Sequence, residues 1–112
     1  MSNASDAGYE AVAKICRVLS RSARIHVIEA IADGASSRIE IADAVAKETG
    51  RPRHDVRTTL VHVHLPVLEE ASVVEHDSET GAVTAGACFT DVYEFVLESL
   101  HKVRAVNEEN TR

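Results

Sequence analysis

The chain has 112 residues, a length that suits one folded domain with its own hydrophobic core. Trp is absent, and with two Tyr and two Phe this core has to be mainly aliphatic. Twelve Lys and Arg residues against eighteen Asp and Glu residues give a net charge of −6. That balance argues against non-specific binding to nucleic acid, because such binding depends on neutralising phosphates.

The charge balance has a second interpretation. Three Lys against nine Arg, abundant Ala and Val, and widely spread acids are typical of proteins adapted to concentrated salt. At molar salt the Debye length falls to about 3 Å, so close contacts rather than net charge would decide binding.

We expect a cytoplasmic protein with no membrane contact. The sequence contains neither a signal peptide nor an apolar run long enough to span a bilayer. Cys16 and Cys88 lack the spacing of a zinc or redox motif. We expect both thiols to be buried in a reducing compartment.

Apolar residues at spacings of three and four predict helices over 7–19 and 21–33, the second ended by Gly34. A capping box, Ser37-Arg38-Ile39-Glu40, predicts a third helix from Arg38 to about Glu48. Gly50 and Pro52 mark the turn that follows it.

A fourth helix is predicted from Arg53 or Asp55 to Ala71, with Pro66 inside it. Proline cannot donate to the carbonyl of His62, so the helix either kinks there or splits into two halves. Residues 72–76 and 82–85 predict two strands around a polar loop, and a long amphipathic helix begins at Phe89.

This order predicts a mainly α protein with a small β-hairpin, a winged helix-turn-helix with an added N-terminal helix and a long C-terminal helix. The winged domain would span 7–85 and a C-terminal dimerisation helix 88–108, with flexible ends at 1–6 and 109–112.

Donor-rich side chains gather at the predicted recognition helix of this otherwise acidic chain. They are Arg51, Arg53, His54, Arg57, Thr58, Thr59 and His62. Such groups bind phosphates and base edges, so we expect them to contact DNA. Leu60, Val63 and Val67 recur at i, i+3 and i+7 and would face the core. The alternative is that the arginines are solvated and pair with Asp55 and Glu48.

The histidines do not predict a metal site. His62 and His64 are two residues apart and point to nearly opposite faces of a helix, whereas helical ligand pairs need a spacing of three or four. We expect His62 to face the DNA groove and His64 to be a structural residue with its hydrogen bonds satisfied. The sequence also lacks a glycine-rich elbow, a phosphate loop or a spaced carboxylate pair, so we predict no enzyme activity, catalytic residue or cofactor.

The run from Asp55 to Val74, with His62-Val63-His64-Leu65-Pro66 and Leu68-Glu69-Glu70-Ala71, resembles a haloarchaeal family of winged helix-turn-helix proteins. The likeness extends from about Ser20 to Thr84, and it is shared more loosely with small repressors of the ArsR type. The resemblance implies a DNA-binding transcriptional regulator in a salt-loving archaeon.

Two features depart from the family pattern. The turn of the wing carries Glu75, Asp77 and Glu79 with no Arg or Lys, and Ser72 stands where a Gly often precedes the strand. The acidic turn argues against phosphate binding by the wing.

The last helix has more apolar surface than one small domain needs, so we expect it to pair with its symmetry mate and with the first helix in a two-fold dimer. The predicted interface residues are Tyr9, Val12, Leu19, Phe89, Val92, Tyr93, Val96, Leu100 and Val103. Two recognition helices about 34 Å apart would then read a pseudo-palindromic site.

Two other functions stay open. The winged helix can serve as a protein-interaction adaptor that does not bind DNA, with its acidic wing and last helix as partner surfaces. It can also serve as a sensor of an unknown effector, with a pocket between the first and last helices.

Overall fold

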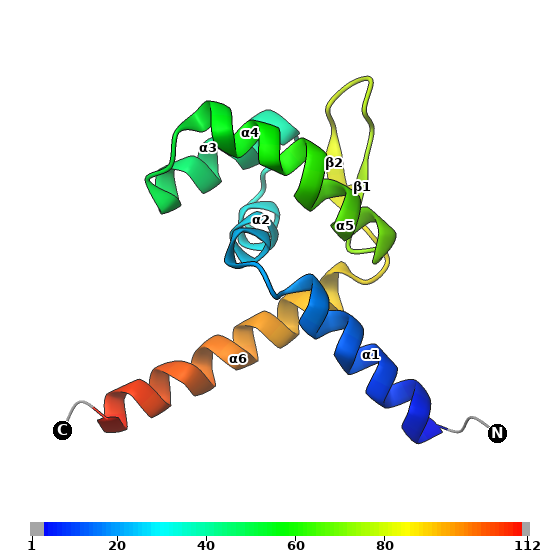
Figure 1. Ribbon diagram of the computed structural model, residues 1–112, viewed down its shortest axis with the longest axis vertical. Coiled ribbons are helices and arrows are strands. Elements are labelled where there is room, and N and C mark those ends of the chain that lie inside the picture. The colour runs from blue at the N-terminus through cyan, green and yellow to red at the C-terminus, as the bar shows by residue number, and fades with distance from the viewer. Residues whose placement is uncertain (1–3, 111–112) are drawn as a thin grey trace.

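The computed structural model of the protein describes residues 4–110, with side chains from residue 7 to residue 108. The first half of the chain forms α1 (Ala4–Val18), α2 (Ser22–Ala32) and α3 (Arg38–Thr49). An interrupted helix follows, made of α4 (Arg53–Thr59), a π-helical turn η1 (Leu60–His64) and α5 (Leu65–Glu70). The strands β1 (Val74–His76) and β2 (Val83–Ala85) and the helix α6 (Phe89–Asn110) complete the order (Figure 1).

This is a mainly helical, winged helix-like arrangement with a two-stranded hairpin and a long C-terminal helix, so the predicted fold class is confirmed. Figure 1 shows α1 and α6 projecting from the side of the body opposite to α3 and α4. Both helices exceed their predicted bounds, since residues 4–6 and 109–110 are helical. The rest of the predicted flexible ends lies outside the described residues.

The core is aliphatic, as the composition requires. Its largest fully buried side chains come from α2, α3, the interrupted helix and the hairpin with the turn before it: Val27, Ile28, Ile41, Leu60, Leu65, Leu68, Val73, Val74 and Val83. Helix α2 contacts both α3 and α6, which places it at the centre of the body. Within residues 4–110, no helix is both long enough and apolar enough to cross a bilayer.

The capping box begins α3 as predicted. The Ser37 hydroxyl accepts a hydrogen bond of 3.1 Å from the Glu40 amide, and the Glu40 carboxylate accepts one of 3.2 Å from the Ser36 amide. Together with the hydroxyl groups of Ser36 and Ser37, that amide holds the pKa of the Glu40 carboxyl below its usual value. At the other end, Gly50 has a φ of 70° and closes α3 through an amide bond to the Ala46 carbonyl.

Pro66 changes the hydrogen-bond pattern of the interrupted helix without ending it. The preceding turn, η1, has π-type bonds, in which the Leu65 amide reaches back five residues to the Leu60 carbonyl. Pro66 then occupies the first turn of α5, where its missing N–H costs least. The chain therefore stays helical through Pro66, with one π-helical turn before it, and does not separate into two helices.

The hairpin is fastened to the start of α3. Its strands are antiparallel, with Val74 opposite Ala85, and a further bridge joins Ala82 to Ser37. The Arg38 amide donates to the Gly81 carbonyl at 2.9 Å. The Arg38 guanidinium donates to the Ser78 carbonyl at 3.0 Å and lies 3.2 Å from His76 Nε2.

The first predicted strand, 72–76, starts later than expected because Ser72 is in a turn. Its φ of 61° lies in the left-handed region, which explains why glycine suits this position. Gly86 packs against the same turn, where an added Cβ would lie 2.4 Å from the Ser72 carbonyl oxygen.

Replacing Ser72 with Gly should raise the free energy of unfolding by about 1 kcal/mol, because the left-handed conformation then costs nothing. Gly86→Ala should lower it by roughly 2 kcal/mol, because the new methyl group meets backbone that cannot move aside cheaply. Urea denaturation followed by circular dichroism measures both. A loss of stability in Ser72→Gly would contradict this account of the turn.

Candidate nucleic-acid interface

The predicted DNA-binding residues lie on α4, on η1 and in the turn before them. His54, Arg57, Thr58 and His62 are exposed, and their spacing of i, i+3, i+4 and i+8 puts them on one face of the helix. Arg51 is exposed just before the helix begins, and Arg53 is its first residue. Six of the seven predicted residues are thus open to solvent, and we call the face of His54, Arg57, Thr58 and His62 the outer face.

Thr59 is the exception. It is half-buried and lines the inner side of the helix together with Val56, Leu60 and His64. Its hydroxyl donates to the Asp55 carbonyl at 2.9 Å, and the Thr58 hydroxyl donates to the His54 carbonyl at 3.0 Å. The Thr58 hydroxyl hydrogen is therefore used within the helix, and Thr59 stands apart from the outer face.

Two of the three arginines are free to bind an anion. Arg53 Nε lies 2.9 Å from Asp43 Oδ1, an ion pair without an aligned hydrogen bond that ties the start of α4 to α3. The side chains of Arg53 and Asp43 are 62% and 41% exposed, so this pair contributes less than about 1 kcal/mol. Among the described residues, Arg51 and Arg57 form no ion pair, and Arg53 does not use the partners Asp55 and Glu48 that the alternative interpretation names.

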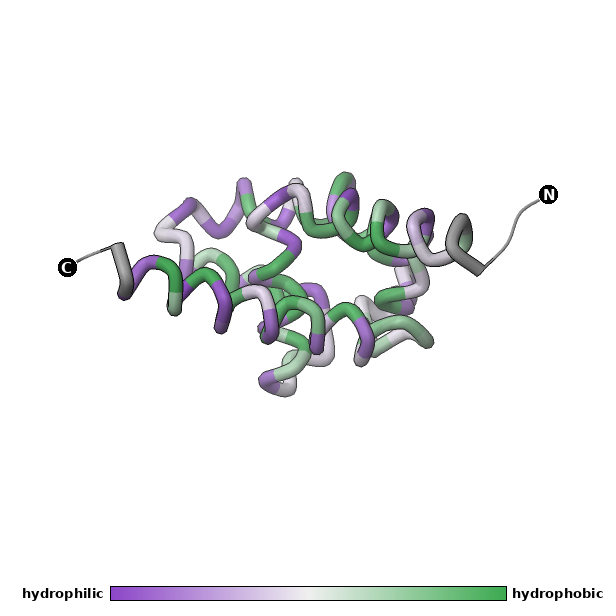
Figure 2. The backbone as a smooth tube through the Cα atoms, turned by 90° about the horizontal axis from the view of Figure 1, so that it is seen from below, coloured by the Kyte–Doolittle hydropathy of each residue, from purple (hydrophilic) through white to green (hydrophobic). Residues whose placement is uncertain are grey.

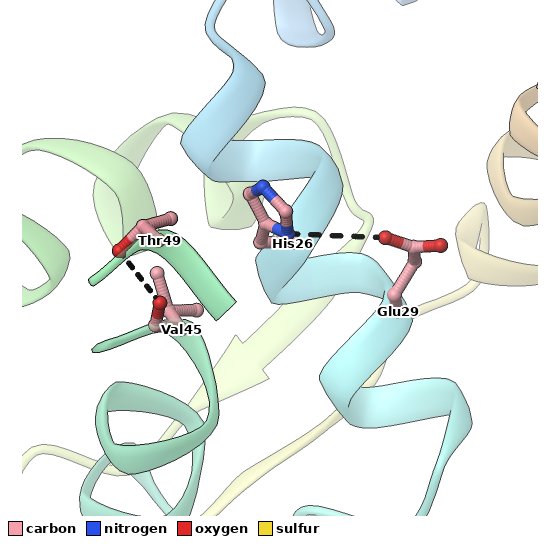
Figure 3. A network of polar contacts seen from close by, with 4 residues as sticks. All are labelled: His26, Glu29, Val45 and Thr49. Atoms are coloured by element: carbon pink, nitrogen blue, oxygen red, sulfur yellow. Dashed lines mark hydrogen bonds and ion pairs between the residues drawn. The ribbon is translucent and has the colours of Figure 1, made fainter. Parts of the chain in front are cut away.

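The turn that carries Arg51 is held by the end of α3. The Thr49 hydroxyl donates to the Val45 carbonyl at 2.7 Å and accepts a bond of 3.4 Å from the Arg51 amide. Figure 3 shows the first of these contacts beside α2, where His26 Nδ1 lies 4.0 Å from Glu29 Oε1. Arg51 is thereby placed by backbone and not by a carboxylate partner.

Arg38 and Ile39 extend the outer face but are not among the predicted residues. A hollow of about 190 Å³ lies between the start of α3 and the interrupted helix, lined by Arg38, Ile39, Arg57, Leu60 and Val61. Ile39 is 55% exposed and places apolar surface beside the hollow. The capping box places Arg38 in the first turn of α3, but its hairpin partners follow 38 and 40 residues later, and no spacing rule joins them.

The wing keeps its acidic character. Glu75, Asp77 and Glu79 are exposed. The Asp77 carboxylate accepts bonds from the amides of Glu79 and Thr80, at 2.9 and 3.4 Å, which lower the pKa of its carboxyl. Asp77 therefore shapes the turn, while Glu75 and Glu79 remain free to repel phosphate.

The two histidines of the interrupted helix differ in burial. His62 is exposed, but His64 is buried with its Nδ1 atom lacking a hydrogen-bond partner in the part of the chain described, so its predicted satisfaction is wrong. Burial lowers the pKa of the His64 imidazole, and three guanidinium groups lower it further. They belong to Arg24, Arg21 and Arg51.

The cysteine expectation is also corrected. Cys16 is exposed on α1 and Cys88 is half-buried, so these thiols are not core residues. Across the described residues, no group of three or more His, Cys, Asp or Glu side chains is arranged to hold a metal ion.

A family profile described as a domain of unknown function, DUF7344, matches residues 16–84, which is more than half of the chain. The chain belongs to the DUF7344 family. The matched DUF7344 region contains α2 to β1, most of β2 and the whole outer face, and it excludes α6 and most of α1. No curated protein and no solved structure matches the chain significantly.

The predicted dimer residues lie largely outside the DUF7344 match. Tyr9, Val12 and Val103 are exposed at 76, 53 and 55%. Three residues are half-buried: Leu19, Tyr93 and Leu100. Phe89, Val92 and Val96 are at most 9% exposed and pack within this chain, which corrects their assignment to a partner surface.

The exposed apolar surface includes residues beyond that set. Leu97 and Val106, on the protruding part of α6, are 46 and 54% exposed. Figure 2 shows hydrophobic positions recurring between hydrophilic ones along this part of α6. The two projecting helices of the DUF7344 chain therefore both carry apolar side chains that the chain itself does not cover.

The buried His64 predicts a pH-dependent stability for the DUF7344 chain. Since its pKa is lowered in the folded state, the unfolded state binds the proton more readily, and the free energy of unfolding should fall as the pH drops below about 6.5. The slope from one proton is at most about 1.4 kcal/mol per pH unit. Glu40 and Asp77 have lowered pKa values and lose their contributions only below about pH 4.5, in a separate window.

Urea titrations at several pH values between 7.5 and 5, with one series for each variant, measure this slope. His64→Leu should flatten it between about pH 6.5 and 5, and the exposed His62→Gln should leave it unchanged. An unchanged slope in His64→Leu would mean that other groups carry the dependence.

Proposed function

We propose that the protein is a DNA-binding transcriptional regulator that reads a pseudo-palindromic site as a homodimer. The single observation that carries the proposal is the outer face, on which His54, Arg57, Thr58 and His62 lie together and are exposed. Arg57 has no carboxylate partner among the described residues. Asp55, the nearest acid in sequence, is two positions from Arg57 and therefore on the other side of the helix.

In the proposed mechanism the outer face enters the major groove, as the second helix of a helix-turn-helix does. Arg57 pairs bidentately with a guanine, and Thr58 and His62 contact neighbouring base edges. Arg51 binds a backbone phosphate next to the positive end of the helix dipole, and Arg53 braces α4 against α3.

Ile39 and Val61 add an apolar component to this face. They flank Arg57 around the hollow at the start of α3. Apolar side chains in the major groove contact the methyl group of thymine, so they would favour a thymine beside the base that Arg57 reads. Arg38, held by the hairpin, supplies a second guanidinium there.

The acid excess is reconciled with DNA binding through salt. We place the protein in the cytoplasm of a salt-adapted archaeon, where screening confines electrostatics to contacts of a few ångströms. Under those conditions the acidic wing does not repel DNA at a distance, and short contacts of the outer face decide affinity.

The homodimer rests on the projecting helices. Tyr9 and Val12 on α1 and Leu97, Val103 and Val106 on α6 are all at least 46% exposed. Two-fold pairing would bury such side chains on both copies at once. It would also set two outer faces at the spacing of successive major-groove turns, about 34 Å.

Arg57→Ala should weaken binding to the specific site by roughly 1–3 kcal/mol and reduce the preference over a scrambled duplex. Arg51→Ala should instead weaken binding to both duplexes alike. It should also make the slope of log affinity against log salt concentration shallower by about one, because one phosphate contact is lost. Fluorescence anisotropy with the upstream DNA of the protein's own gene, titrated across KCl, measures both effects.

Lys102→Ala is the matched control for these variants, because Lys102 is an exposed cation on α6, away from the outer face. If Arg57→Ala and Lys102→Ala lose equal amounts of affinity for the specific duplex, Arg57 does not belong to the DNA-binding site. Absence of any preference between duplexes at every salt concentration favours the adaptor, an alternative supported by the exposed Glu75 and Glu79 of the wing.

Val12→Glu and Val103→Glu should each shift the protein from dimer to monomer in sedimentation equilibrium, because a charge would be buried in the paired surface. Thr90→Glu adds the same charge at an exposed polar position of α6 and should leave the dimer intact. A wild-type protein that sediments as a monomer at micromolar concentration would contradict the dimer.

A further inference from the structure

A second group of cations lies away from the outer face. Between Glu10 and Glu29 the sequence contains no acid and four Lys or Arg residues: Lys14, Arg17, Arg21 and Arg24. They span the end of α1 and the start of α2. In a chain of net charge −6, this segment concentrates positive charge where the proposed DNA contact does not use it.

Arg24 is the buried member of this group, with 7% of its surface exposed. Its Nη1 atom donates to the carbonyls of Arg17 and Val18, at 3.3 and 3.1 Å, and so caps the C-terminal end of α1. Its Nε atom has no hydrogen-bond partner in the described part of the chain. The guanidinium is therefore held rigidly while part of its donor capacity is unused.

A hollow of about 700 Å³ opens beside this guanidinium, between α1, α2 and α5. Lys14, Arg17 and Arg24 line it, against Glu70 as the one carboxylate in its lining. Val18, Val67 and Ala71 supply apolar wall. The volume suits a small molecule, and the excess of cations suits a negatively charged one.

An apolar hollow of about 240 Å³ adjoins the first, between α1 and the start of α6. Ile15, Val73 and Val92 are among its lining residues, and Asp91 is the one carboxylate in its lining. The two hollows share Lys14, Val18 and Ala71 in their walls, so they lie next to each other. Figure 1 shows the end of α1 crossing the start of α6 below α5.

We propose that the two hollows form one binding site for a small organic anion, with its carboxylate or phosphate at Lys14, Arg17 and Arg24 and its apolar body between α1 and α6. Guanidinium groups bind either anion through charge-assisted hydrogen bonds. The apolar hollow then selects ligands that carry a hydrocarbon or aromatic body over inorganic anions.

The site touches the two parts of the molecule that the proposed function needs. Its walls include α5, which continues the helix of the outer face, and α1, which carries the exposed Tyr9 and Val12. A ligand bound there contacts both, so it is a candidate effector of DNA binding. That last step rests on the proposed function, whereas the anion site does not.

Titration of the full chain, without DNA, tests the site by amide chemical shifts and by calorimetry. The probes are phenyl phosphate and phenylacetate, with inorganic phosphate and benzyl alcohol as controls that each lack one half of the ligand. At least one of the two aromatic anions should bind with one site per chain and shift amides in residues 14–24 and 67–73, but not in 51–62. The stronger of the two identifies the anionic group, and both controls should bind roughly tenfold more weakly.

Exposed residues at the rim supply the variants, so that folding is preserved. Lys14→Gln and Arg17→Gln should each lower the affinity for the aromatic anion by roughly tenfold. Glu70→Gln should raise that affinity, because it removes a negative charge that repels the anion. Lys102→Gln on α6 should leave the affinity unchanged.

Three results would overturn the proposal. The first is that neither aromatic anion, at millimolar concentration, changes the amide chemical shifts of residues 14–24. The others are that Glu70→Gln binds the anion more weakly, or that Lys102→Gln and Arg17→Gln lose equal affinity for it. Because no DNA is present, such a failure leaves the proposed function standing. Loss of DNA binding in Arg57→Ala, in turn, says nothing about this site.

Discussion

The helix from Arg53 to Glu70 has to bury one side against α3 and the core while leaving the other side open, and the rest of the structure depends on how it meets both demands. Its inner side supplies Leu60, Leu65 and Leu68 to the core, all at most 2% exposed. Pro66 removes one amide from the helical pattern, and the chain absorbs this loss in a π-helical turn. The turn lets the polar outer face and the buried segment after it belong to one continuous element.

Electrostatics divides the surface into two cationic regions on an acidic protein. One is the outer face with Arg38 and Arg51 beside it, and the other is the segment from Lys14 to Arg24. Between them lies His64, and burial together with arginines from both regions lowers the pKa of its imidazole. The position of each arginine, rather than the net charge, therefore decides what this surface can bind.

Much of the fold was predictable from the sequence, because it depends on local rules. The capping box at Ser37 and Glu40 and the glycine at position 50 each act within one helical turn, and they begin and end α3 as the pattern predicted. The outer face followed from helical spacing. The predictions failed where distant segments meet: Arg38 is held by the hairpin, Arg53 pairs with Asp43, and Phe89 joins the core of its own chain. Periodicity identifies an apolar stripe but not the surface that covers it.

The central claim is that the outer face contacts duplex DNA. Amide and side-chain chemical-shift mapping of the full chain with its upstream DNA, at salt concentrations where binding is specific, tests it most directly. The account predicts shifts at Ile39, Arg51, Arg57, Thr58 and His62, with little change at Lys102 on α6. Shifts confined to the hairpin and α6, with the outer face unchanged, would contradict it and assign the winged helix to a protein partner.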